Sequence, residues 1–328
     1  MKRFDWYDEI HRLDAEADAR RITFILGAHE FPWDMSQALG LALYRTYAVP
    51  SIGGLLGDTE EFTDRTQHRY DDTALLLGQM LQHGFEPGRG RDALRRMNQM
   101  HRSYDISNDD YLYVLSTFVV MPPRWLNDWG FGWRRLSEHE IRANTNYYRD
   151  LGRHMGIKEI PGTYEEFCTL MDGYEREHFG YTEGGRAVSD STLELMLTFS
   201  PPWQRPLMKK FTTALLDDRL TEAFRYEPAT PFWKGAARFA LKARAKVVRF
   251  MPPRVEPRTE EDNPNIKSYP EGFDPNRIGT FPTKCPVPHD LKTVEVSGSR
   301  DRVPAPGEAL PPEQRASARQ GAQQGERG

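Results

Sequence analysis

One histidine in the sequence lies in surroundings that suit the binding of a metal cofactor. On a helical wheel, residues 94–104 divide into an apolar face and a polar face. The apolar face carries Leu94, Met97, Met100, His101 and Tyr104. A neutral imidazole in such surroundings offers a nitrogen lone pair, which a haem iron requires, while the apolar neighbours exclude water. The alternative is a core histidine that is hydrogen-bonded to a carbonyl group.

A second pair of residues could face the same cofactor. Arg69 and Thr73 are four residues apart, so on a helix they share one face, next to the apolar residues of the run 74–81. The arginine could anchor a propionate group, and the threonine could offer a hydroxyl to bound oxygen. In the alternative, these residues form an exposed first turn in which Arg69 pairs with Asp71 or Asp72 and contributes little.

A third arrangement would bind metal without a porphyrin. Glu175 and His178 have the spacing that supplies two ligands to a di-iron site in a helical bundle. A complete site needs a second such pair, and the sequence has none, because Leu136 stands where a glutamate would have to precede His139. The alternative is a solvated helix end at residues 175–178.

Several segments together resemble a known family. They are residues 95–104 (RRMNQMHRSY), 106–117 (ISNDDYLYVLST), 129–140 (ending in LSEHE) and 151–161 (LGRHMG through Ile160-Pro161). As a pattern they resemble the catalytic domain of the MpaB and rubber oxygenase family, from about Pro32 to Pro202 and plausibly onward to Pro253. The resemblance implies a helical protein that binds haem b through a histidine. Its latex-clearing members use dioxygen to cleave carbon–carbon double bonds of isoprenoid chains.

The resemblance assigns roles to the residues described above. It implies that His101 is the proximal iron ligand and that Arg69 and Thr73 lie on the distal helix. Two positions depart from the latex-clearing pattern: Asn98 stands where arginine is frequent, and Asp72 replaces the lysine that is the second axial ligand. We therefore expect a haem b-dependent oxygenase with water or nothing at the sixth position. Its partners are expected to be dioxygen and a hydrophobic, isoprenoid or lipid-like small molecule.

The elements that must position these residues are predicted to be helices. Signals typical of helix starts occur at residues 107–110, 137–140 and 163–166, and Pro122-Pro123, Gly156 and Pro201-Pro202 are expected to end helices. The nearly continuous apolar run from Tyr111 to Met121 predicts a central helix surrounded by others. The fold class is therefore all-α, a single multi-helix domain with a globin-like helical core around a haem pocket.

Composition separates a packable body from a tail. All seven tryptophans precede residue 234, whereas 11 of the 24 prolines follow residue 255. We therefore predict a helical domain over residues 1–255 and an extended to disordered tail rich in proline, glycine, serine and glutamine over residues 256–328, which has too little apolar area to join a core.

Charge and cysteine content exclude other classes. A net charge of −4 gives no reason to expect a nucleic-acid partner, and two cysteines without motif spacing suggest neither a zinc site nor a disulfide scaffold. The N-terminus lacks the apolar core of a signal peptide, and no apolar run reaches membrane-spanning length. The expected location is cytoplasmic, with possible peripheral attachment to a membrane surface.

That attachment is suggested by the segment from Trp233 to Phe250, which contains basic residues and no acidic ones. The wheel places Lys234, Arg238, Lys242, Lys246 and Arg249 in one arc. It places Phe239 and Phe250 among the apolar residues on the opposite side. Such a helix could lie on an anionic membrane, or it could pack on the body with a solvated basic face. The rival to an enzyme is accordingly a non-catalytic helical binding or membrane-surface module.

Overall fold

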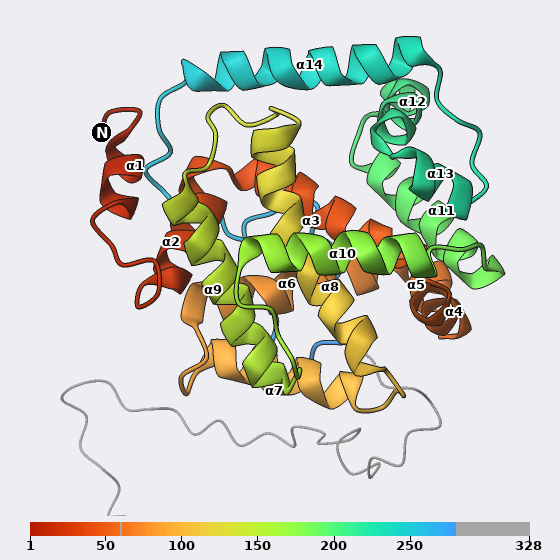
Figure 1. The fold of residues 1–328 in the computed structure, drawn as a ribbon, viewed down its shortest axis with the longest axis horizontal. Coiled ribbons are helices and arrows are strands. Elements are labelled where there is room, and N and C mark those ends of the chain that lie inside the picture. The colour runs from red at the N-terminus through yellow and green to blue at the C-terminus, as the bar shows by residue number, and fades with distance from the viewer. Residues whose placement is uncertain (60, 280–328) are drawn as a thin grey trace, which may run out of the picture. The chain divides into compact units, whose positions relative to one another are not determined.

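A computed structural model describes residues 1–59 and 61–279 of the chain. These residues form one all-α unit, and the described part contains no β-strand, which confirms the prediction of a single all-α domain (Figure 1). The predicted disorder of the last residues falls on positions 280–328, which lie outside the described residues. The helices are α1 (Asp5–Ile10), α2 (Ala19–Ile25), the π-helical η1 (Leu26–Glu30), α3 (Pro32–Thr46), α4 (Pro50–Asp58), α5 (Glu61–Asp64), α6 (Thr66–His83), α7 (Arg89–His101), α8 (Asn108–Pro123), the π-helical η2 (Arg124–Asp128), α9 (Glu138–Met155), α10 (Tyr164–His178), α11 (Glu183–Thr198), the 3-10 turn η3 (Pro202–Gln204), α12 (Arg205–Leu215), α13 (Asp218–Ala223) and α14 (Pro231–Arg249).

The central helix is α8, as predicted. Every residue from Leu115 to Pro123 is buried, and the helix packs against α3, α9 and α10 (Figure 1). Its N-terminus is capped by the Ser107 hydroxyl, which accepts a hydrogen bond from the Asp110 backbone amide at 3.0 Å. Because all sides of α8 meet other helices, its apolar run needs no single apolar stripe.

The expectation that Pro122 and Pro123 end this helix is wrong. Both prolines lie within α8, and the chain continues directly into η2. A proline at position i leaves the carbonyl at i−4 without its usual donor, so Pro123 frees the carbonyl of Val119. The side-chain amide of Asn144 on α9 donates to that carbonyl at 3.4 Å. The neighbouring helix thus satisfies a buried group that the proline leaves unbonded.

The predicted starts of α9 and α10 and the predicted end of α9 are confirmed. Ser137 and Glu140 form a reciprocal capping box at the start of α9, and Thr163 and Glu166 form another at the start of α10. Gly156 ends α9 in a left-handed conformation with a φ of 80°. These boundaries depend on neighbours within four residues, which explains why local sequence identifies them.

Helices α4 and α11 approach each other through glycines. A Cβ atom built on Gly57 would lie 2.5 Å from the Cα of Gly184, which is closer than packed carbon atoms allow. One built on Gly54, on the same helix, would meet nothing within 4 Å. The contact therefore requires the absence of a side chain at Gly57. It places α4 against α11, and α5, which follows α4, contacts α6.

The predicted boundary at residue 255 falls too early. The segment 256–279 lacks regular secondary structure but packs on α6 and α7, and Ile278 is fully buried. The Asp71 carboxylate accepts hydrogen bonds from the backbone amides of Lys267 and Ser268, and Asp72 accepts one from the Tyr269 hydroxyl. The segment is therefore fixed by hydrogen bonds to buried carboxylates, which a count of apolar residues does not detect.

Helix α14 runs along the outer edge of the described helices and packs on α12 (Figure 1). Ala237 and Ala245 are buried on its inner side. Of the predicted basic face, Arg238, Lys242, Lys246 and Arg249 are exposed, whereas Lys234 is partly buried and pairs with Asp218 at 2.6 Å. The expectation that Phe239 and Phe250 lie opposite that face is wrong. Both rings are exposed to solvent and do not face the body of the protein. At 100° per residue the two rings lie beside the basic stripe, and the inner face is formed by smaller residues.

Candidate functional site

His101 is the last residue of α7, so the helix ends before residue 104, to which the helical wheel had extended it. The residue is half-buried, and its ring meets the Tyr111 ring edge-on with centroids 5.7 Å apart. The Nδ1 atom is buried and has no hydrogen-bond partner. In the alternative interpretation, His101 is a core histidine that is hydrogen-bonded to a carbonyl group. In the described part of the chain, no carbonyl group accepts a hydrogen bond from Nδ1. A buried ring nitrogen without a partner is unusual in a folded protein and calls for an explanation.

The His101 ring is neutral at physiological pH. Burial lowers the pKa of His101 to about 4, because water no longer solvates the charged form. Repulsion from the Arg69 guanidinium is the second, smaller cause of this lowered pKa. The imidazole therefore keeps a lone pair available to a Lewis acid over the physiological pH range.

Arg69 and Thr73 share one face of α6, as predicted. The guanidinium donates to the Thr73 hydroxyl at 3.4 Å, and that hydroxyl donates to the Arg69 carbonyl at 3.0 Å. The guanidinium also lies over the Phe62 ring, 5.2 Å from its centroid. Among the described residues, Arg69 forms no ion pair with a carboxylate, although it is half-buried. It is thus a cation with unused hydrogen-bonding capacity.

The alternative for Arg69, an exposed turn in which it pairs with Asp71 or Asp72, is wrong. Both carboxylates are buried and bind the C-terminal segment. Asp72 also contacts the His68 ring, with 3.2 Å between Oδ2 and Nδ1. Asp72, which the resemblance aligns with the axial lysine of latex-clearing proteins, therefore helps to hold Tyr269 of that segment.

The structure brings together α6 and α7, which carry the three predicted residues. The charge of Arg69 acts on the His101 imidazole across this helix pair, so the two side chains lie within electrostatic range. The C-terminal segment closes the same region, because Arg96 on α7 donates to the Ile278 carbonyl at 2.6 Å. A Cβ atom on Gly279 would lie 2.3 Å from the Met100 sulfur, next to His101 in sequence.

This covering segment is the part of the candidate site's surroundings that the sequence interpretation missed. The apolar residues Ile266, Tyr269, Phe273 and Ile278 recur within its proline-containing sequence and contact the core. Their recurrence was the available signal, but it has no helical or strand period. The buried position of Asp71 and Asp72 could not be inferred without it.

Glu175 and His178 do not form a shared metal site. Glu175 is buried, contrary to the expected solvated helix end, and its carboxylate binds Arg45, with 2.6 Å between Oε1 and Nε. Tyr113 donates to the same carboxylate at 3.2 Å. His178 is exposed and stacks on Tyr174. Within residues 1–59 and 61–279, no group of three or more histidine, cysteine, aspartate or glutamate side chains is arranged to hold a metal ion.

Comparison with known proteins identifies the family of this helical unit. A family model described as "ER-bound oxygenase mpaB/B'/Rubber oxygenase, catalytic domain" matches residues 28–250. The chain belongs to this family. The MpaB and rubber oxygenase family is one of oxygenases, which agrees with the predicted enzyme class. The match includes Arg69, Thr73 and His101, and it extends to α14.

Three individual proteins similar to this chain are from Penicillium species. The chain is 30% identical over 244 residues to the ER-bound oxygenase mpaB' of Penicillium brevicompactum, covering 69% of this chain and 57% of that protein. It is 30% identical over 215 residues to the ER-bound oxygenase mpaB of Penicillium roqueforti (strain FM164), covering 60% and 72%. The mpaB of P. brevicompactum is 29% identical over 234 residues, covering 69% and 55%. The chain thus spans little more than half of two of these relatives. No helix of the described residues is both long and apolar enough to cross a bilayer.

Proposed function

We propose that this chain is a haem b-dependent oxygenase that uses dioxygen to oxidise, or to cleave a carbon–carbon double bond of, a hydrophobic substrate of the isoprenoid or lipid class. The observation that carries the proposal is the His101 ring: its Nδ1 atom is buried without a partner, and its low pKa keeps it neutral. A histidine can bind iron only in its neutral form, in which one ring nitrogen has a free lone pair.

The residues around His101 fit such a cofactor. His101 would bind the iron, and Arg69 would donate to a propionate carboxylate, for which no protein carboxylate competes among the described residues. Thr73 would position Arg69, because its hydroxyl accepts from the guanidinium. Phe62 and Tyr111 supply aromatic surface that excludes water. Haem supplies redox chemistry with dioxygen that amino-acid side chains lack.

The chain's residues would also determine what the oxygenase accepts. Arg69 is the cation next to His101, and we assign it to the cofactor, so recognition of the substrate would rest on apolar contacts. Apolar contacts select by shape and hydrophobicity, which suits an isoprenoid or lipid-like molecule. A cytoplasmic location stays a prediction.

A spectrum of the purified protein tests the cofactor. Protein produced with added haem precursor should show a strong Soret band and about one haem per chain. His101→Ala should lose the band and keep its helix content, and free imidazole should restore the band by filling the space of the lost ring. His178→Ala, in which an exposed histidine is removed, is the matched control and should bind haem as the parent does.

Two outcomes contradict the proposal. One is a folded, colourless protein that does not take up added hemin. The other is a folded His101→Ala variant that retains haem without imidazole, because the ligand would then be another residue. Iron without porphyrin would instead point to a non-haem centre.

A further inference from the structure

The outer face of α14 exposes three large aromatic rings. Phe232, Phe239 and Phe250 have exposed fractions of 71%, 75% and 86%. Their spacings of seven and eleven residues place them within about 20° of one another on a helix. Of the eleven exposed large apolar residues in the described chain, six lie between Phe232 and Val255. Exposed apolar side chains scattered singly need no explanation, but a row on one helix does.

A basic stripe runs beside the phenylalanines. Arg238, Lys242, Lys246 and Arg249 are exposed, and none of them forms an ion pair with a described residue. The helix contains no acidic residue that could neutralise them. Since the whole chain has a net charge of −4, any attraction to an anionic partner must come from a local patch such as this one.

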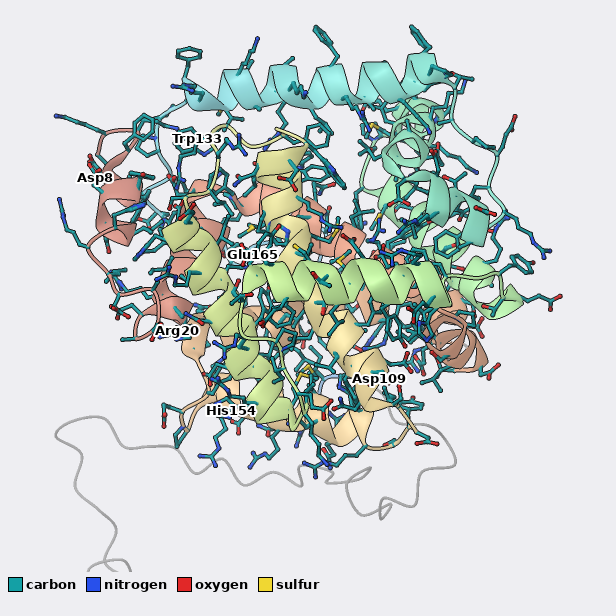
Figure 2. All side chains as sticks on the ribbon, in the orientation of Figure 1. Asp8, Arg20, Asp109, Trp133, His154 and Glu165 are labelled. Carbon is teal, nitrogen blue, oxygen red and sulfur yellow. The ribbon has the colours of Figure 1, made fainter. Side chains whose placement is uncertain are left out.

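The inner face of α14 has different chemistry and is held firmly. Arg244 binds Asp34 at 2.9 Å and lies 3.8 Å from the centroid of the Trp33 ring. Lys234 binds Asp218 at 2.6 Å. The two cations on the inner face therefore form ion pairs with other helices, whereas the four on the outer face form none with a described residue. The outer side chains project away from the other helices (Figure 2).

We infer that the outer face of α14, defined by Phe232, Phe239 and Phe250 and the four basic residues above, docks on an anionic lipid bilayer surface. Anionic lipid headgroups carry the negative charge that would pair with the basic stripe. The acyl boundary just beneath them takes up aromatic rings, so both stripes are satisfied at once only at such an interface. The 19-residue helix is about 28 Å long and would lie in the plane of the surface.

This inference goes beyond the proposed oxygenase function and does not depend on haem. Its test uses sedimentation of the full chain, with and without haem, with vesicles of phosphatidylcholine alone or with added phosphatidylserine. Binding should require phosphatidylserine and should weaken as salt is raised. Failure of the haem proposal would leave this result unchanged, so the two can be judged separately.

Two independent variants address the two stripes. Lys242→Glu with Lys246→Glu should lower the partition coefficient onto phosphatidylserine vesicles by at least about 25-fold, because each basic residue near such a surface contributes roughly fivefold. Phe239→Ser with Phe250→Ser should lower it by at least about tenfold and leave its salt dependence intact. Arg91→Glu with Lys158→Glu is the control, since these exposed residues lie on α7 and after α9. It should bind as the parent does.

The inference is overturned if the parent protein does not bind phosphatidylserine vesicles, or if the α14 variants bind as tightly as the control pair. It is also overturned if the parent forms a dimer that Phe239→Ser with Phe250→Ser dissociates, because the face would then join two copies of this chain. Binding to single-stranded DNA without binding to vesicles would also overturn it, because the partner of this face would then be a nucleic acid. All substituted side chains are exposed, so circular dichroism should show unchanged folding.

Discussion

At the scale of single residues, the site depends on two side chains that lack ordinary partners. Arg69 has no carboxylate and His101 has no hydrogen bond to its buried nitrogen within the described residues. Burial and the positive charge of Arg69 both disfavour protonation of the ring, so the imidazole stays neutral and its lone pair stays available to a ligand. Sites that bind a cofactor commonly show such unsatisfied groups.

This arrangement predicts a pH dependence of stability. The pKa of His101 is about 4 in the folded protein and 6.5 when unperturbed, so the unfolded chain takes up a proton first as pH falls. The neutral His101 ring therefore contributes at most about 3 kcal/mol to the free energy of unfolding. This contribution is complete above pH 6.5 and is lost as the pH falls from about 6.5 to 4. Urea unfolding of the haem-free parent and His101→Met should therefore diverge across this range, with the variant less sensitive to acid.

The control is His178→Met, in which an exposed histidine is replaced in the same way. Parallel curves for the parent and His101→Met would show that the buried ring contributes nothing to the pH dependence. The shared face of Arg69 and Thr73 was predictable because helical periodicity is local. Asp71 and Asp72 were misread as possible partners of Arg69, because their true partners are 196 and 197 residues away.

At the scale of helices, α4 is placed by its glycine contact with α11. Gly57→Ala puts a methyl group against the backbone of Gly184, so the helices must move apart. The expected loss is about 1–3 kcal/mol in the free energy of unfolding. Gly54→Ala on the same helix meets nothing and should be neutral or stabilising by up to about 1 kcal/mol. Thermal unfolding of both variants checks the difference, and equal effects would rule out the close approach.

Helix starts were predictable, whereas helix interiors were less so. The capping boxes of α9 and α10 involve residues three apart, so the sequence displays both partners. The passage of α8 through Pro122 and Pro123 depends on Asn144 from another helix. The burial of Glu175 similarly depends on Arg45, which is 130 residues away in the chain. Contacts between helices decide these cases, and local patterns do not contain them.

At the scale of the whole molecule, the segment 256–279 stabilises α6 and α7. A chain ending at residue 255 should be less stable than one ending at residue 279, by at least about 2 kcal/mol, because it loses hydrogen bonds to two carboxylates and the burial of Ile278. Comparing the two truncations by urea denaturation isolates the contribution of these residues. Equal midpoints would mean that the segment adds nothing to the fold.

The same segment has a consequence for the timing of assembly. A ribosome releases the chain from its N-terminus, so α6 and α7 emerge before the residues that cover them. At ordinary rates of synthesis the interval between His101 and Ile278 is on the order of ten to forty seconds. Throughout this interval the α6–α7 pair is free of its C-terminal cover and in contact with water. A cofactor that reaches the imidazole in this interval meets an open helix pair, whereas later it must displace a folded segment.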